Sequence, residues 1–119
     1  MRKNWLRISY FLAASLAGCT HPLPPLLQGV APVSHGDSPE FVQRLKDRFP
    51  AGSTEIALMH ELRLNGFQPD TGLDASQRAA PLTIYGNLSY LCRRDADVRW
   101  SAESGRLTAI SGNYRVTCP

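Results

Sequence analysis

The sequence has little of what most catalytic sites need. Its three histidines are His21, His35 and His60, and no second metal ligand follows His60 one helical turn later. No serine lies in a Gly-x-Ser-x-Gly or Ser-x-x-Lys motif, and no phosphate-binding glycine pattern occurs. Asp95 and Asp97 are interleaved with arginines, which favours a solvated loop over an acid–base pair. We therefore expect no enzymatic activity, no cofactor and no metal site.

Long hydrophobic runs are absent. The apolar stretch from Ile8 to Ala17 is far shorter than the roughly 20 residues that a membrane-spanning helix needs. It follows a basic N-terminal segment and ends in Leu16-Ala17-Gly18-Cys19, the pattern of a bacterial lipoprotein signal peptide. The sequence predicts that residues 1–18 are removed and that Cys19 carries fatty acyl (palmitate) groups, which would anchor the protein to a lipid bilayer.

A charge excess is missing from the chain after Cys19. The sequence has thirteen Lys and Arg, ten Asp and Glu, and a formal net charge of +3. Arg2, Lys3 and Arg7 of the predicted signal peptide account for that excess. A balanced domain lacks the basic surface that binds nucleic acid. We expect no nucleic-acid partner, and no small-molecule substrate is evident.

Cysteine is also scarce, with three in the chain. If Cys19 carries lipid, Cys92 and Cys118 are the remaining pair, and an oxidising envelope compartment favours a disulfide over two free thiols. Closing a loop of about 27 residues would stabilise the fold by about 3 to 4 kcal/mol. A zinc site is disfavoured because these cysteines lack the closely spaced ligand pairs that zinc sites use.

Residues 19–37 are predicted to be the acylated cysteine and a flexible tether. Prolines and glycines recur through this segment, so it cannot sustain a helix. Eighteen residues of coil span about 23 Å, enough to hold the domain clear of the lipid headgroups. Part of the tether is expected to dock on the domain or on a partner, because it contains apolar residues that a spacer does not need: Leu23, Leu26, Leu27 and Val30.

Residues 38–119 are predicted to be a single domain that opens with two short helices. Ser38 suits the N-cap and Pro39 the first turn of a helix that Pro50 stops; its apolar face is Phe41, Val42, Leu45 and Phe49. Ser53 or Thr54 caps the second helix, whose apolar stripe is Leu58, Met59 and Leu62. With Gly66 left-handed after Asn65, Phe67 should pack on Leu62 in a Schellman termination.

Strands follow a loop that prolines and a glycine predict over residues 68–81. The hydrophobic period then changes to two, which predicts strands over residues 82–92, 97–102 and 106–117. The expected core-facing residues are Leu82, Ile84, Leu88, Tyr90, Cys92, Val98, Trp100, Ile110, Tyr114, Val116 and Cys118.

The hydrophobic alternation also predicts the turns. A two-residue turn at Ser104-Gly105 would send Ile110 to the face opposite Val98, whereas a three-residue loop over 103–105 pairs these two residues. A three-residue loop over 93–95 likewise keeps the first two strands in phase. The expected fold is α+β, with two N-terminal helices packed on a three-stranded antiparallel meander (ααβββ).

This meander sets a geometric condition on the disulfide. Cys92 and Cys118 would end strands separated by the middle one, about 9 to 10 Å apart, whereas bridged Cα atoms lie within about 7 Å. At least one of the two cysteines must therefore lie past the start of the middle strand.

The candidate partner-binding residues are Tyr85, Leu91 and Leu107, which fall on the strand parity opposite the expected core. The alternative is that the tether and the 68–81 loop cover this face, since isolated exposed apolar residues are common.

The order of these features resembles the SmpA/OmlA (BamE-like) small bacterial outer-membrane lipoproteins. Phe49-Pro50-Ala51-Gly52-Ser53 is similar to the turn before the family's second helix, whereas the 68–81 loop and the Cys92/Cys118 pair depart from its usual pattern. The resemblance implies an ααβββ domain that acts as an accessory or scaffold in envelope assembly. With Thr20 and not aspartate after Cys19, it also points to the outer membrane.

We therefore expect a membrane-anchored envelope lipoprotein that binds a protein partner or acts as a scaffold in outer-membrane assembly or maintenance. The alternative is a lipid-anchored inhibitor of an envelope or host hydrolase such as lysozyme. In that case Ser111-Gly112-Asn113-Tyr114-Arg115 would be an inserting loop, although the sequence favours a β-bulge at Gly112 over this reading.

Overall fold

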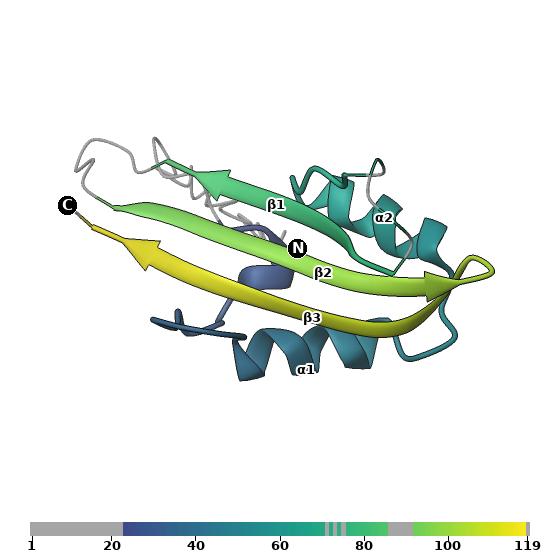
Figure 1. Cartoon of the computed structure of the whole chain (residues 1–119). Helices are drawn as coiled ribbons and strands as arrows, with labels where there is room; N and C mark the ends of the chain where they lie inside the picture. Colours follow the sequence, from purple (N-terminus) through teal and green to yellow (C-terminus); the bar gives the residue numbers. More distant parts are fainter. Residues whose placement is uncertain (1–22, 71, 73, 75, 86–91, 119) are drawn as a thin grey trace, which may run out of the picture.

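A computed structural model describes residues 23–70, 72, 74, 76–85 and 92–118. In chain order these form a 3₁₀ turn η1 (Pro25–Leu27), helices α1 (Pro39–Arg48) and α2 (Glu55–Leu64), and strands β1 (Arg78–Ile84), β2 (Arg93–Glu103) and β3 (Arg106–Thr117). The strands make one antiparallel sheet in the order β1-β2-β3 (Figure 1). The predicted α+β class is confirmed. The predicted signal peptide, Cys19 and Leu91 lie outside the described residues.

Helix α1 starts where the sequence predicts, but the side chain of the residue before it, Ser38, does not cap the helix. Ser38 is the N-cap residue, yet its side chain makes no capping hydrogen bond. Its hydroxyl accepts a hydrogen bond from the Tyr114 N–H at 2.8 Å, and its own N–H donates to the Gly112 carbonyl at 3.0 Å. Ser38 is 1% exposed, and it ties the start of α1 to the outer edge of β3.

Both predicted ends of α2 are confirmed. The Thr54 hydroxyl caps the helix by accepting from the Ala57 N–H at 3.3 Å. At the other end Gly66 has φ 85°, and the Phe67 N–H donates to the Leu62 carbonyl at 2.9 Å while the Gly66 N–H donates to Arg63 at 3.0 Å. These two bonds are the Schellman pattern, which only a left-handed residue at position 66 permits.

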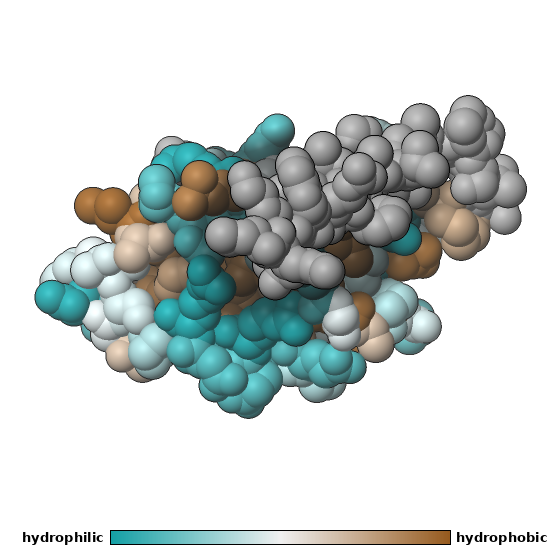
Figure 2. Space-filling model, turned by 180° about the vertical axis from the view of Figure 1, so that it is seen from behind, coloured by the Kyte–Doolittle hydropathy of each residue, from teal (hydrophilic) through white to brown (hydrophobic). Residues whose placement is uncertain are grey.

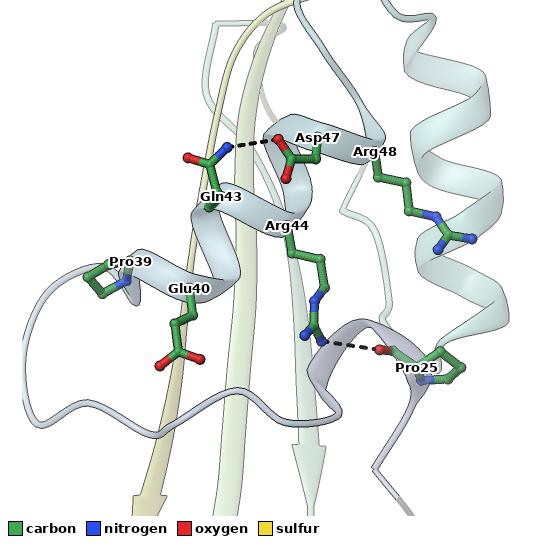
Figure 3. A pocket seen from close by; sticks show the side chains of 7 residues that line it. All are labelled: Pro25, Pro39, Glu40, Gln43, Arg44, Asp47 and Arg48. Carbon is green, nitrogen blue, oxygen red and sulfur yellow. Dashed lines mark hydrogen bonds between the residues drawn. The ribbon is translucent and has the colours of Figure 1, made fainter.

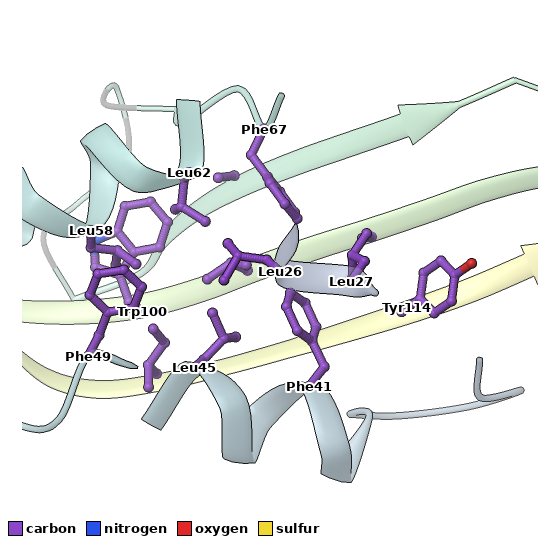
Figure 4. Packing of buried hydrophobic residues seen from close by; sticks show 14 of the residues in the cluster. Leu26, Leu27, Phe41, Leu45, Phe49, Leu58, Leu62, Phe67, Trp100 and Tyr114 are labelled. Carbon is purple, nitrogen blue, oxygen red and sulfur yellow. The ribbon is translucent and has the colours of Figure 1, made fainter. Parts of the chain in front are cut away.

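The segment before α1 packs into the core, so a flexible tether over residues 19–37 is wrong for residues 23–30. Leu26 and Leu27 are 1% and 0% exposed, and Val30 is also buried. Figure 4 shows the two leucines of η1 lying between the side chains of α1 and α2, over the sheet. The alternative expectation, that apolar residues of this segment dock on the domain, is confirmed.

Two polar side chains hold η1 in place. The buried Asn65 accepts from the Leu26 N–H at 3.0 Å through Oδ1 and donates to the Glu61 carbonyl at 2.8 Å. From the other side, Arg44 Nη1 donates to the carbonyls of Leu26 and Gln28 at 3.1 and 2.6 Å (the guanidinium is drawn in Figure 3). The backbone groups of the short 3₁₀ turn thus have side-chain partners from α1 and from the C-cap residue of α2, as a buried turn requires.

The first strand occupies a different part of the chain from the predicted residues 82–92. It begins at Arg78, inside the predicted loop, and Pro81 lies in the middle of it. The Pro81 carbonyl accepts from the Gln68 N–H at 3.0 Å, so this residue points its backbone polar groups to the sheet edge. Because proline lacks only the N–H that would face outward there, β1 tolerates it as an edge strand.

The shift of β1 moves the next turn as well. Residues 93–95, predicted as a loop, are the first residues of β2, and Ala80 pairs with Val98. Leu82 and Ile84 keep the predicted core-facing parity, and both are half-buried. Leu88 and Tyr90 lie outside the described residues.

A disulfide joins Cys92 to Cys118 with their Cα atoms 4.1 Å apart, which confirms the predicted pair. Cys92 directly precedes β2 and Cys118 directly follows β3, next to the paired residues Arg93 and Thr117. The two cysteines therefore end neighbouring strands. The expected separation by a middle strand does not arise, because Cys92 begins β2 and does not end β1.

The β2–β3 connection is the two-residue turn that the parity argument rejects. Ser104 and Gly105 both have positive φ, 51° and 76°, as a type I′ hairpin turn requires. A register shift next to Ser101 and Ala102 leaves Thr108 as an extra residue in β3. This bulge restores the alternation beyond it and turns Leu107 into the core, at 3% exposure. Leu107 is therefore not the exposed residue that the sequence predicts.

Further along β3 the pairing is regular, so the predicted bulge at Gly112 is wrong. Ile110 pairs with Trp100, and Gly112 pairs with Val98, in place of the predicted pairing of Val98 with Ile110. Val116, predicted to face the core, is 38% exposed. The reason is visible in Figure 1, where neither α1 nor α2 reaches this end of the sheet.

Gly112 sets how closely α1 approaches β3. A Cβ atom at position 112 would lie 2.9 Å from Phe41 Cε2 and 3.0 Å from Leu45 Cδ1, closer than packed carbon atoms tolerate. Phe41 and Leu45 are fully buried and cannot move aside into solvent. The absence of a side chain at Gly112 therefore lets the helix lie flat on the strand.

We predict that Gly112→Ala lowers the free energy of unfolding by about 1 to 3 kcal/mol, because the added methyl group overpacks the α1–β3 contact. Ser111→Ala, one residue earlier on the opposite face, serves as the control and should change it by less than about 0.5 kcal/mol. Urea denaturation of the soluble form from Thr20 onward measures both. Equal stability of the two variants would contradict the close contact.

Leu27→Ala should lower the free energy of unfolding of the same soluble form by about 2 to 5 kcal/mol, because it opens a cavity in the core. Gln28→Ala changes the neighbouring exposed residue and should have little effect. Fluorescence-monitored urea unfolding distinguishes the two. A Leu27→Ala protein as stable as Gln28→Ala would mean that residues 23–30 do not pack on the domain in solution.

Candidate interaction surface

The two faces of the sheet differ in chemistry. On β2 one face buries Ala96, Val98, Trp100 and Ala102, and the alternate residues point to the other side. That other side, which we call the outer face, follows from the strand register and comprises Ala79, Pro81, Thr83, Arg93, Asp95, Asp97, Arg99, Ser101, Ala109, Ser111, Asn113 and Arg115. Its side chains are small, polar or charged.

Four charged residues of the outer face form ion pairs: Arg93, Asp95, Asp97 and Arg99. Arg99 contacts the carboxylate of Asp37, which precedes α1, and lies 3.4 Å from that of Asp97. Asp95 accepts from Arg93 Nε at 2.8 Å and from the Thr83 hydroxyl at 3.0 Å. Arg99 and Asp37 are about half exposed, so these pairs contribute little to stability. They hold neighbouring side chains of positive and negative charge in place on the outer face.

The pKa of the Asp97 carboxyl group departs from its ordinary value. Partial burial raises the pKa of its carboxyl group, and the neighbouring Asp37 carboxylate acts in the same direction. Arg99, a hydrogen bond with Asn113, and Arg115 oppose the rise without cancelling it. The outer face therefore holds a carboxylate whose negative charge is partly desolvated.

A second charged group lies at the opposite end of the sheet and has a structural role. Glu55, in the first turn of α2, accepts from Trp100 Nε1 at 2.8 Å. Arg78 Nε lies 3.0 Å from the same carboxylate oxygen, although its N–H does not complete a hydrogen bond. These contacts fix the start of α2 to β1 and β2.

The three predicted partner-binding residues do not form one site. Tyr85 follows β1 and is 73% exposed, as the sequence predicts, whereas Leu107 is buried for the reason given above. Leu91 lies outside the described residues. Sequence reasoning missed two other exposed apolar residues, Ile56 and Leu64 of α2, at 77% and 69% exposure. Their helical positions, off the Leu58–Leu62 stripe, were the available indication.

One hollow of the described surface lies at the helical side of the domain. An open groove beside η1 and α1 is lined by Pro25, Pro39, Glu40, Gln43, Arg44, Asp47 and Arg48 (Figure 3). Figure 2, seen from behind Figure 1, shows hydrophilic residues in a band across the middle of that side and hydrophobic residues beside it. Within the described ranges no three His, Cys, Asp or Glu side chains are placed to hold a metal ion, and no helix is long and apolar enough to cross a membrane.

Comparison with family models, with curated protein sequences and with solved structures finds no match to this chain.

The raised pKa of Asp97 predicts how stability depends on pH. Above the ordinary aspartate value, 3.8, the folded protein keeps a proton that the unfolded chain has released, so stability falls as pH rises toward neutrality. Asp97→Asn removes this dependence, and the wild-type protein should lose stability relative to that variant over this range. Urea unfolding at a series of pH values measures the difference. Ser111→Ala, which removes no titrating group, should keep the wild-type profile, and parallel profiles for wild type and Asp97→Asn would contradict the shift.

Proposed function

We propose that this chain is a lipid-anchored lipoprotein of the bacterial cell envelope whose domain acts as a protein-binding or scaffold module. The observation that carries the proposal is the segment from the basic N-terminus to Leu16-Ala17-Gly18-Cys19. Its charge, its short apolar run and the small residues before a cysteine match what a lipoprotein signal peptidase recognises. The predicted lipidated residue is Cys19.

The use of cysteine supports this assignment. The chain has three cysteines, and the disulfide takes up Cys92 and Cys118. Cys19 thus has no further cysteine in the same chain with which to pair. A disulfide-bonded domain is also typical of an oxidising compartment such as the bacterial periplasm.

We further propose that the chain is a BamE-like lipoprotein of the outer membrane. Two helices and a three-stranded antiparallel sheet support this resemblance, as does Thr20 in the position after the lipidated cysteine. The turn Phe49-Pro50-Ala51-Gly52-Ser53 joins α1 to α2, as the resemblance implies. In this assignment the domain assists envelope assembly by holding other proteins, and no chemical step is required of it.

The mechanism is concentration at a surface. Acyl chains contribute about 0.8 kcal/mol per buried methylene, and a domain confined near one membrane meets other confined proteins at high effective concentration. The outer face and the exposed Tyr85 are the proposed contact surface, because they offer ordered charges of both signs beside an aromatic ring. Weak contacts of this kind suffice once both partners are held at the same membrane.

The hydrolase-inhibitor hypothesis has no support of its own in the structure. Its expected inserting loop, residues 111–115, lies in the middle of β3 and is paired with β2 along its length. Because the backbone of these residues is paired in the sheet, they do not form a loop that could insert into an enzyme's cleft.

The protein expressed from the full-length gene should carry acyl groups on Cys19 and should fractionate with the envelope, because residues 1–18 direct export and processing. Cys19→Ala should abolish the acyl mass and leave residues 1–18 attached, while Ser15→Ala, within the apolar run, should leave processing unchanged. Intact-protein mass spectrometry of the envelope and cytosolic fractions measures the acyl mass and shows whether residues 1–18 are still attached. An unmodified wild-type N-terminus in cytosolic material would contradict the proposal.

A further inference from the structure

We infer that the η1 side of the domain lies directly against phospholipid headgroups and that the outer face of the sheet points away from the bilayer. This inference rests on the proposed lipidation of Cys19. It goes beyond it by stating how the domain is oriented, and therefore which surface remains open to a protein partner.

The chain becomes part of the folded domain at Leu23. Leu23 packs against the core cluster, and its carbonyl accepts a hydrogen bond from Gln28 Nε2 at 3.0 Å. From there η1 is held by Asn65 on α2 and Arg44 on α1. Because the chain joins the domain at Leu23, well before residue 38, most of the expected spacer cannot extend.

The segment between the predicted lipidated Cys19 and Leu23 limits the distance between the domain and the bilayer. Three residues separate Leu23 from Cys19, and whatever their conformation the four Cα–Cα steps from Cys19 to Leu23 span at most about 14 Å. The headgroup layer of one leaflet is itself about 5 to 8 Å thick. A domain anchored at Cys19 is therefore within contact distance of the headgroups, whereas a spacer of eighteen coil residues would reach about 23 Å.

The position of η1 determines which face of the sheet points toward the bilayer. Leu26 and Leu27 of η1 pack on the buried face of the sheet, in the cluster that includes Val98 and Tyr114 (Figure 4). To bring the outer face to the bilayer, the chain would have to pass through a layer about 10 Å thick and around a sheet about 10 Å wide. A linker of three residues cannot follow that path, so the outer face must look away from the membrane.

The surface that would meet the bilayer has a chemistry that fits. Glu40, Asp47, Arg44 and Arg48 line the groove between η1 and α1 together with Pro25 (Figure 3). These side chains carry both signs of charge, which suits the paired phosphate and ammonium groups of zwitterionic headgroups. The acyl anchor supplies the affinity, and the groove needs only to be compatible with that contact.

The test places a photoreactive benzophenone amino acid on each side of the full, lipidated protein in phosphatidylethanolamine/phosphatidylcholine vesicles. Positions Gln28 and Glu40 report on the η1 side, and the exposed positions Ala109 and Arg115 report on the outer face. After irradiation, mass spectrometry should show phospholipid attached several-fold more often at Gln28 and Glu40. Inserting about twelve Gly and Ser residues between Thr20 and His21 should remove the difference, because the longer spacer frees the orientation.

A protein that is not lipidated on Cys19 and a lipidated protein with a different orientation give different results in this experiment. The same spectra report the acyl mass on Cys19, and its absence would overturn the proposed function. An acylated protein whose four positions attach lipid equally, or whose outer-face positions attach more, would overturn the orientation alone. If the Gln28 variant fails to show the native melting transition, the Glu40 variant decides the result.

Discussion

The burial of Leu26 and Leu27 between the two helices is the contact on which the rest of this fold depends. The two leucines fill the space over the sheet beside the stacked rings of Phe41 and Phe67, whose centroids lie 6.4 Å apart. Asn65 and Arg44 satisfy the backbone of the same turn, so its burial leaves no polar group without a partner there. A three-stranded sheet with two ten-residue helices thereby gains a fuller core.

Much of this architecture is readable from local sequence. The alternation around Val98 and Trp100 predicts which face of β2 is buried, and Asn65-Gly66-Phe67 predicts the end of α2 in atomic detail, because each depends on a few neighbouring residues. Pro81 is the reason that the start of β1 was wrongly predicted as a loop. A proline usually breaks a strand, and only the edge position of β1 makes it acceptable. That position is a property of the whole sheet.

The remaining differences have the same origin in contacts distant along the chain. The extra residue at Thr108 allows a two-residue turn and buries Leu107, and no local pattern announces such a bulge. The apolar residues of the segment 23–30 predict that it docks, but its position depends on Asn65 and Arg44, which lie far along the chain. Of the exposed apolar residues, Tyr85 was recognisable from strand parity, and Ile56 and Leu64 were recognisable from their helical positions off the Leu58–Leu62 stripe. Lipidation of Cys19 stays a prediction.

The hairpin of β2 and β3 is closed at both ends. Ser104 and Gly105 join it at one end, and the Cys92–Cys118 bond joins it at the other, so residues 92–118 form a covalent ring. A ring of this kind cannot slide by one residue, a movement that would exchange the buried and solvated faces. It also cannot lend one strand to a second copy of the chain while the bond is intact. Reduction of that bond would open a route to strand exchange that the oxidised protein lacks.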